Sequence, residues 1–263
     1  MSSPDIRPEP LQLGDRASVF EPAARKRVWW EIIGVWMGTL LLIRGVVFLA
    51  QVVPAVGIPN LFTIDEVILA GVPVLFIYAP VLVCKWRGVD SFAYRLSVPP
   101  FIEWRAWWKA LKESGLWALI FLLPYLPVYH LWTTHVVGRE LGQGSFPPEF
   151  GTLLLYQVFF VAIPEEFFYR GYMQTRFNEL FERKFQVFGV SFGHSLWITS
   201  LLFAFGHSVV TFQWWHFAIF FPSLLFGLIR ERTGSVLPGA FFHAACNVLV
   251  MSLDHFYGVA RVV

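Results

Sequence analysis

Charged residues are scarce in this chain. They make up 14% of its 263 residues, whereas soluble domains average about 25%, and 56% of the residues are hydrophobic. The hydrophobic residues form long blocks instead of alternating with polar ones, which is typical of lipid-facing segments. Composition and length therefore predict a single domain embedded in a membrane.

Cysteine and dense positive charge are also rare. Cys84 and Cys246 are far apart in apolar segments and lack the spacing of zinc ligands, so neither a disulfide nor a structural zinc is expected. The net charge is only +2, and no basic tract is interleaved with aromatic residues. These absences exclude nucleic acid as a partner and leave membrane lipid as the expected surroundings.

The first 28 residues lack the apolar core and small-residue cleavage site of a signal peptide. Since they are polar and rich in Pro, Glu and Arg, we expect a flexible cytoplasmic tail at 1–28. The rest divides into N-terminal transmembrane helices with an interfacial segment at 29–150 and a catalytic helical core at 151–263. Neither end carries a lipidation motif, so the spans themselves must attach the chain to the membrane.

Seven apolar segments predict an all-α, polytopic membrane protein with about seven transmembrane helices around an intramembrane polar cavity. Several are shorter than the ~20 residues that a perpendicular helix needs, so we expect neighbouring protein to shelter them. The segments are Trp30–Val53, Val67–Val83, Leu116–Trp132, Gly151–Ile163 with a polar helical continuation, Leu196–Val210, Trp214–Ile229 and Val236–Leu253.

The distribution of Lys and Arg predicts the orientation of the chain. These residues precede the first segment, lie between the second and third, and follow the fourth and sixth, whereas the loop 54–66 contains none. Cytoplasmic loops are enriched in Lys and Arg, so we expect the N-terminus inside and the C-terminus outside. An endoplasmic reticulum protein would show the same pattern, and between the two we favour a bacterial inner membrane. The stretch Ser91–Lys112 mixes tryptophan with basic residues and predicts a helix lying among the lipid headgroups.

Two carboxylates and an arginine directly follow the fourth apolar segment, in the sequence PEEFFYR from Pro164 to Arg170. A charge at the bilayer centre costs about 2.5–3.5 kcal/mol on insertion scales, so such groups usually serve a function. On a helix, Arg170 lies one turn beyond Glu166 and can pair with it, which leaves Glu165 as the better general base. Pro164 lacks a backbone donor and predicts a helix start or a kink.

Two further pairs of residues have one-turn spacing within apolar segments, and each contains a histidine. Phe203 and His207 belong to the first pair, and His243 and Asn247 to the second. Residues four apart share a helix face, so the polar side chains of each pair can point into one cavity. We expect them to surround a single water or metal ion together with Glu165.

In this order, the motifs EExxxR, FxxxH and HxxxN resemble those of the CPBP family of intramembrane proteases, which is related to CAAX prenyl endopeptidases (the ABI family). The resemblance covers about 151–253. It implies an intramembrane endopeptidase that hydrolyses a peptide bond in a membrane-tethered protein or peptide. Glu165 is then expected to activate water with His207. His243 and Asn247 are expected to stabilise the tetrahedral intermediate, while the paired carboxylate and arginine of the first motif support the site.

The family has also been described as metal-dependent, so two mechanisms are open. We favour a metal-free glutamic mechanism without a cofactor. The alternative is zinc held by Glu165, His207 and His243, since one Glu and two His can leave a fourth position open for water. The motifs HExxH and GxGD and a GxSx nucleophile paired with a downstream His, which mark other membrane proteases, are absent.

Three alternatives to a protease are open at this level. The polar residues can form a structural network between helices, as they do in many membrane interfaces. The chain can also be a non-proteolytic scaffold or immunity protein of the same fold. An ion-coupled transporter is the least favoured, because the charged groups gather in the C-terminal half and no inverted repeat is visible.

Overall fold

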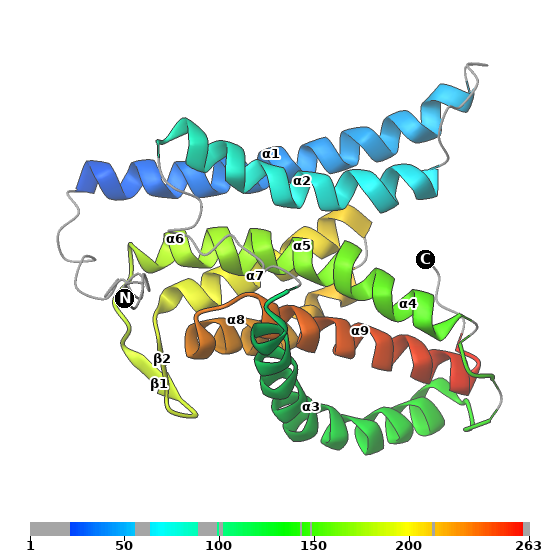
Figure 1. Ribbon diagram of the computed structural model, residues 1–263. Coiled ribbons are helices and arrows are strands. Elements are labelled where there is room, and N and C mark those ends of the chain that lie inside the picture. Colours follow the sequence, from blue (N-terminus) through cyan, green and yellow to red (C-terminus); the bar gives the residue numbers. More distant parts are fainter. Residues whose placement is uncertain are drawn as a thin grey trace.

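The computed structural model describes residues 22–55, 64–88, 99, 102–142, 144–147, 149–211 and 214–259. In this part of the chain the protein is a bundle of helices with one short β-hairpin (Figure 1). Four helical stretches are long and apolar enough to cross a membrane: Pro22–Leu49, Trp104–Val137, Phe150–Asn178 and Leu237–Tyr257. The all-α, polytopic prediction is confirmed, whereas the number of seven crossings stays a prediction.

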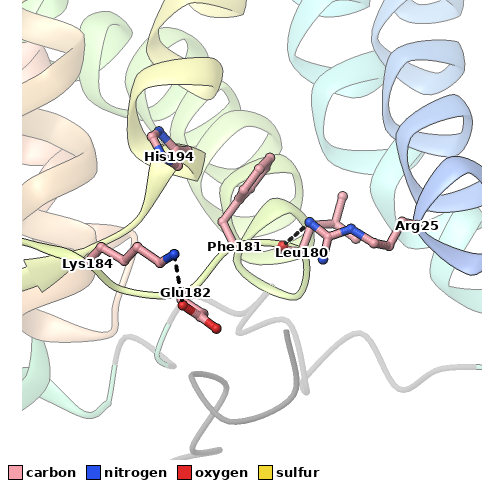
Figure 2. A pocket seen from close by; sticks show the side chains of 6 residues that line it. All are labelled: Arg25, Leu180, Phe181, Glu182, Lys184 and His194. Carbon is pink, nitrogen blue, oxygen red and sulfur yellow. Dashed lines mark hydrogen bonds and ion pairs between the residues drawn. The ribbon is translucent and has the colours of Figure 1, made fainter. Parts of the chain in front are cut away.

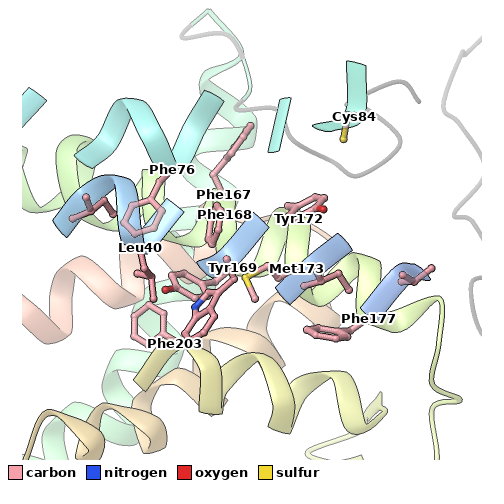
Figure 3. Close-up of a cluster of buried hydrophobic side chains, with 14 of the residues drawn as sticks. Leu40, Phe76, Cys84, Phe167, Phe168, Tyr169, Tyr172, Met173, Phe177 and Phe203 are labelled. Atoms are coloured by element: carbon pink, nitrogen blue, oxygen red, sulfur yellow. The ribbon is translucent and has the colours of Figure 1, made fainter. Parts of the chain in front are cut away.

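Helices α1 (Pro22–Ala55) and α2 (Ile64–Trp86) form one layer of the bundle (Figure 1). They are antiparallel, since Glu31 near the start of α1 pairs with Arg87 just after the end of α2 at 3.4 Å. Their inner faces pack on the central helix in a cluster of buried apolar side chains (Figure 3). Phe76 of α2 meets Phe168 of the central helix there, with ring centroids 5.1 Å apart.

The central helix runs from Phe150 to Asn178 without a break. It consists of α4 (Phe150–Tyr156), the π-helical η4 (Gln157–Ala162), α5 (Ile163–Glu166), the π-helical η5 (Phe167–Gln174) and α6 (Thr175–Asn178). The predicted helix start at Pro164 is wrong, because the helix continues through the proline, whereas the predicted kink stays a prediction. Widened π turns on both sides accommodate the backbone around its missing donor. Every residue from Ala162 to Asn178 is buried.

The remaining elements surround the central helix. They are α3 (Trp104–Trp132) with the π turn η3 (Thr133–Val137), strands β1 (Phe185–Val187) and β2 (Val190–Phe192), α7 (His194–Thr211), the 3-10 helix η6 (Trp214–Ile219), α8 (Phe220–Thr233) and α9 (Leu237–Tyr257). Helix α3 curves and then follows α9 (Figure 1). The antiparallel hairpin β1–β2 was not predicted from the sequence.

Two predicted boundaries need correction. Helix α1 begins at Pro22, so residues 22–28 of the predicted tail are helical and extend the first span; residues 1–21 lie outside the described residues. The basic and tryptophan-rich stretch predicted as an interfacial helix continues, from Trp104 onward, into α3 as one helix. Most of its earlier residues lie outside the described residues.

Ion pairs gather at one end of the bundle, where α1 and α9 begin and where α2, α6 and α8 end. The pairs are Arg87–Glu31, Arg176–Glu31, Arg176–Glu179, Arg183–Glu231 and Arg232–Glu113. We call this the charged end. Each arginine in these pairs belongs to a segment that the sequence assigns to the cytoplasmic side, so the fold brings those segments together.

Candidate active site

The first motif forms the expected pair inside the protein. Arg170 Nη1 lies 3.1 Å from Glu166 Oε1, and both side chains have no exposed surface. The π turn of η5 starts immediately after Glu166, yet the one-turn spacing of the pair is preserved. A buried carboxylate and a buried guanidinium each need a partner, and here they neutralise each other.

Arg170 is surrounded on its other sides as well. Its Nη2 donates to both the backbone carbonyl (3.0 Å) and the hydroxyl (2.6 Å) of Ser223 in α8. The guanidinium carbon lies 4.4 Å from the ring centroid of Phe203 and 5.3 Å from that of Phe226, a cation–π arrangement. The arginine therefore ties the central helix to α7 and α8.

His243 reaches this pair from α9. Its Nδ1 lies 3.1 Å from Glu166 Oε1 and donates to that oxygen, because a carboxylate paired with arginine can only accept. Phe226 stacks on the imidazole, with centroids 4.6 Å apart and planes at 16°. These two contacts fix the ring plane and the tautomer, so Nε2 carries the lone pair in the neutral ring.

His207 is oriented in the same way from α7. Its Nδ1 lies 3.0 Å from the backbone carbonyl oxygen of Phe203, one turn earlier, and a carbonyl accepts only. The Phe203 ring lies 4.5 Å from the imidazole. The neutral ring therefore also presents an unprotonated Nε2.

Both imidazoles aim these Nε2 atoms at Glu165. Its Oε2 lies 3.7 Å from Nε2 of His207 and 3.8 Å from Nε2 of His243, longer than a hydrogen bond. This oxygen is buried and has no hydrogen-bond partner among the described residues. The His207 side chain is 26% exposed and the Glu165 side chain 11%, so the site opens on the side of α7.

Asn247 lies one turn beyond His243 on α9, where its Nδ2 donates to Oε1 of Gln157 at 2.9 Å. Gln157 is buried and approaches Met251 through its own Nε2, 3.6 Å from the sulfur. The contact determines which way the Asn247 amide faces, since Oε1 of Gln157 can only accept. The described contacts thus bring together Glu165, Glu166 and both histidines, while Asn247 joins them through its helix.

Sequence reasoning missed three residues of this arrangement: Gln157, Ser223 and Phe226. Gln157 carried a signal, because it is a polar residue within the apolar segment that leads to the first motif. Ser223 and Phe226 carried little, because a serine and a phenylalanine are ordinary residues of an apolar helix. Their importance depends on α8 lying beside the motif.

The zinc alternative requires Glu165, His207 and His243 to bind one metal ion. Within the described part of the chain, no group of three or more His, Cys, Asp and Glu side chains is arranged to hold a metal ion. As placed, the three side chains therefore do not form a ligand set. The two cysteines are free thiols, Cys84 buried and Cys246 half-buried.

Comparison with known proteins bears on the same segment. No curated protein and no solved structure matches the chain. Residues 147–249, which contain all three motifs, match the family described as type II CAAX prenyl endopeptidase Rce1-like. In this segment the chain is therefore similar to intramembrane proteases of the CAAX type. The resemblance drawn from the three motifs is therefore confirmed for residues 147–249, the Rce1-like part of this chain.

Proposed function

We propose that this protein hydrolyses a peptide bond in a membrane-tethered protein or peptide, with Glu165 as the general base. The observation that supports this is the convergence of two imidazole Nε2 atoms on a buried carboxylate oxygen that has no described partner. Each imidazole is fixed at its Nδ1, so the converging atoms are acceptors that can orient a water molecule.

The proposed reaction begins when Glu165 removes a proton from that water, assisted by His207. The water oxygen attacks the carbonyl carbon and the carbonyl becomes an oxyanion. The protonated carboxyl then gives its proton to the leaving amine as the carbon–nitrogen bond breaks. The greater exposure of His207 supports entry of water and peptide on the α7 side of the site.

The oxyanion requires donors that are already oriented before the reaction. His243, held at Nδ1 by Glu166, supplies such a donor in its imidazolium form, which carries a proton on Nε2 as well; in that form only Nε2 of His207 accepts from the water. The Asn247 amide has a second N–H besides the one that binds Gln157, and that contact orients it. Glu166 and Arg170 act through His243, as positioning residues.

Replacement of Glu165 tests the proposal. Membrane-protein termini are compared by mass spectrometry in host cells that carry wild type or Glu165→Gln at matched expression and insertion. We expect new termini with wild type that disappear with the variant. Glu182→Gln is the matched control, since Glu182 is half-exposed and lies outside the site.

Identical termini in all strains, with His207→Ala and Asn247→Ala also silent, point to the scaffold or immunity alternative. In that case the same residues bind a partner without turnover. The control variant separates this outcome from a general effect of changing a carboxylate.

The zinc alternative has its own test. In the metal-free mechanism, purified protein that generates these termini in vesicles keeps its activity after treatment with a strong chelator. Complete loss of activity with the chelator and recovery on addition of zinc contradict the metal-free mechanism. They support the alternative in which Glu165, His207 and His243 hold zinc.

A further inference from the structure

The hairpin between the central helix and α7 buries its two strands unequally. Its register pairs Phe185 with Phe192 and Val187 with Val190, so these four apolar side chains share one face and the paired glutamine and serine lie on the other. Val190 and Phe192 are buried, whereas Phe185 is 38% and Val187 41% exposed. The apolar face therefore extends beyond the area that the protein covers.

Phe188 occupies the tip in an unfavourable backbone conformation. Its φ is +51°, in the left-handed region where Asn and Gly are the usual first residues of a two-residue hairpin turn. Gly189 follows with φ +73°. The phenylalanine ring is 64% exposed. A strained, exposed phenylalanine in a tight turn indicates that its side chain acts on something outside the turn.

The tip touches α3 one turn beyond the residue of that helix, Glu113, that forms an ion pair. The ring of Phe188 lies 6.2 Å from the rings of Trp117 and Phe121, edge-on to both. The Trp117 indole donates to Glu113 at 3.0 Å, and Glu113 pairs with Arg232 at 2.7 Å. The buried Trp117 ring and its N–H, bound to an ion pair, mark the point where the charged start of α3 passes into its apolar part. Phe121 lies one turn further along the apolar part of α3.

The base of the hairpin is charged. Lys184 and Glu182 form an exposed ion pair at 3.1 Å, and Arg25 of α1 donates to the Leu180 carbonyl nearby (Figure 2). These residues line a small cavity of about 160 Å³, and His194 at the start of α7 lines it as well. Charged groups beside an exposed apolar tip match the order of layers in a bilayer surface.

We propose that the hairpin tip is a bilayer contact, in which Phe188, Phe185 and Val187 enter the boundary between lipid headgroups and acyl chains. A two-stranded sheet has open edges whose backbone groups need water or headgroup partners, so the hydrocarbon core is excluded as its place. The contact holds the hairpin, and with it the adjoining ends of the central helix and α7, at the membrane surface. The proposal is independent of the catalytic mechanism.

Spin labels measure this contact directly. The full chain, with Cys84 and Cys246 replaced by alanine, carries Phe188→Cys or Lys184→Cys and is labelled and placed in phosphatidylethanolamine and phosphatidylglycerol vesicles. Collisions are measured with oxygen, which concentrates among acyl chains, and with a water-soluble nickel chelate. We expect an oxygen-to-nickel ratio several-fold higher at position 188 than at the control position 184.

Equal ratios at the two positions overturn the proposal, because the tip is then in water. Weak collisions with both reagents at position 188 also overturn it, since the side chain is then enclosed against α3 alone. If Phe188→Cys does not insert, Val187→Cys gives the same reading, because that side chain is on the same exposed apolar face.

Discussion

Glu165 and Glu166 are adjacent in the sequence but differ in what they contact. Glu166 pairs with Arg170 and accepts from His243, and its side chain has no exposed surface. Loss of its charge leaves the guanidinium buried without a counter-ion. Breaking such a pair costs about 3–5 kcal/mol of unfolding free energy. Glu166→Gln is therefore expected to lower stability strongly, as measured by thermal denaturation in detergent.

Glu165→Gln is the matched comparison for that measurement. Its Oε2 has no described hydrogen-bond partner, and a glutamine amide of the same shape can donate to the neighbouring imidazoles. We expect this variant to unfold at nearly the wild-type temperature while losing activity. Similar destabilisation by both substitutions contradicts the division of roles between the two carboxylates.

At this scale the sequence predicted contacts within one helix well. The Glu166–Arg170 pair follows from one-turn spacing, and in the structure Arg170 Nη1 lies 3.1 Å from Glu166 Oε1. The stacking of Phe226 on His243 was missed, because it depends on the packing of α8 against α9 and leaves no local signal. The contact of Gln157 with Asn247 joins residues 90 apart in the chain for the same reason.

At the scale of elements, three polar contacts join the central helix to α8 at a constant separation of 53 residues. Arg170 bonds Ser223, Gln174 bonds the Gly227 carbonyl, and Asn178 bonds Glu231. We call these three contacts the polar ladder. The residue numbers rise together along the two helices, and their difference stays the same. The central helix and α8 therefore run parallel. The ladder thereby fixes Arg170, and through it the EExxxR motif, relative to α8.

Gly227 is the tightest point of the polar ladder. A Cβ there would lie 2.2 Å from Leu196 Cδ1 and 2.8 Å from Gln174 Oε1. Gly227→Ala is expected to destabilise the protein by about 1–3 kcal/mol, because overpacking pushes α7 and α8 apart. Thermal denaturation in detergent measures the loss.

Gly239→Ala is the control for this substitution. A Cβ at position 239 would meet its nearest atoms at 3.5 Å, an ordinary contact distance. Alanine is the better helix former, so this variant is expected to match or exceed wild-type stability. Equal stability of both variants contradicts close packing at Gly227.

Other elements show where local sequence signals were insufficient. Pro164 was expected to start or kink the helix, since a proline removes one backbone donor. The structure instead has a helix that continues through Pro164, with a π turn on either side of the segment that contains it. The hairpin was missed because each strand has only three residues, too few for an alternating pattern. Long apolar helices, by contrast, were visible in composition alone.

In the whole molecule, the segments predicted to face the cytoplasm lie together at the charged end. The hairpin base at Glu182 and Lys184 adjoins this end, whereas the turn around Leu141 contacts the end of α9, where the Gly142 amide donates to the Phe256 carbonyl at 3.2 Å. Cations are retained on the cytoplasmic side, so the charged end is expected to face the cytoplasm. The site lies between these two ends.

Cysteine labelling tests this orientation. In a chain whose own cysteines are replaced by alanine, Glu182→Cys and Leu141→Cys are treated in intact cells with a maleimide that does not cross the inner membrane. We expect Leu141→Cys to react in intact cells and Glu182→Cys to react only after the membrane is opened, since both positions are exposed but lie at opposite ends. The reverse pattern places the N-terminus outside, and reaction of both in intact cells contradicts a chain that spans the membrane between them. Helix α9 carries His243 from the charged end toward the opposite side. The labelling result therefore also shows from which side of the membrane α9 enters.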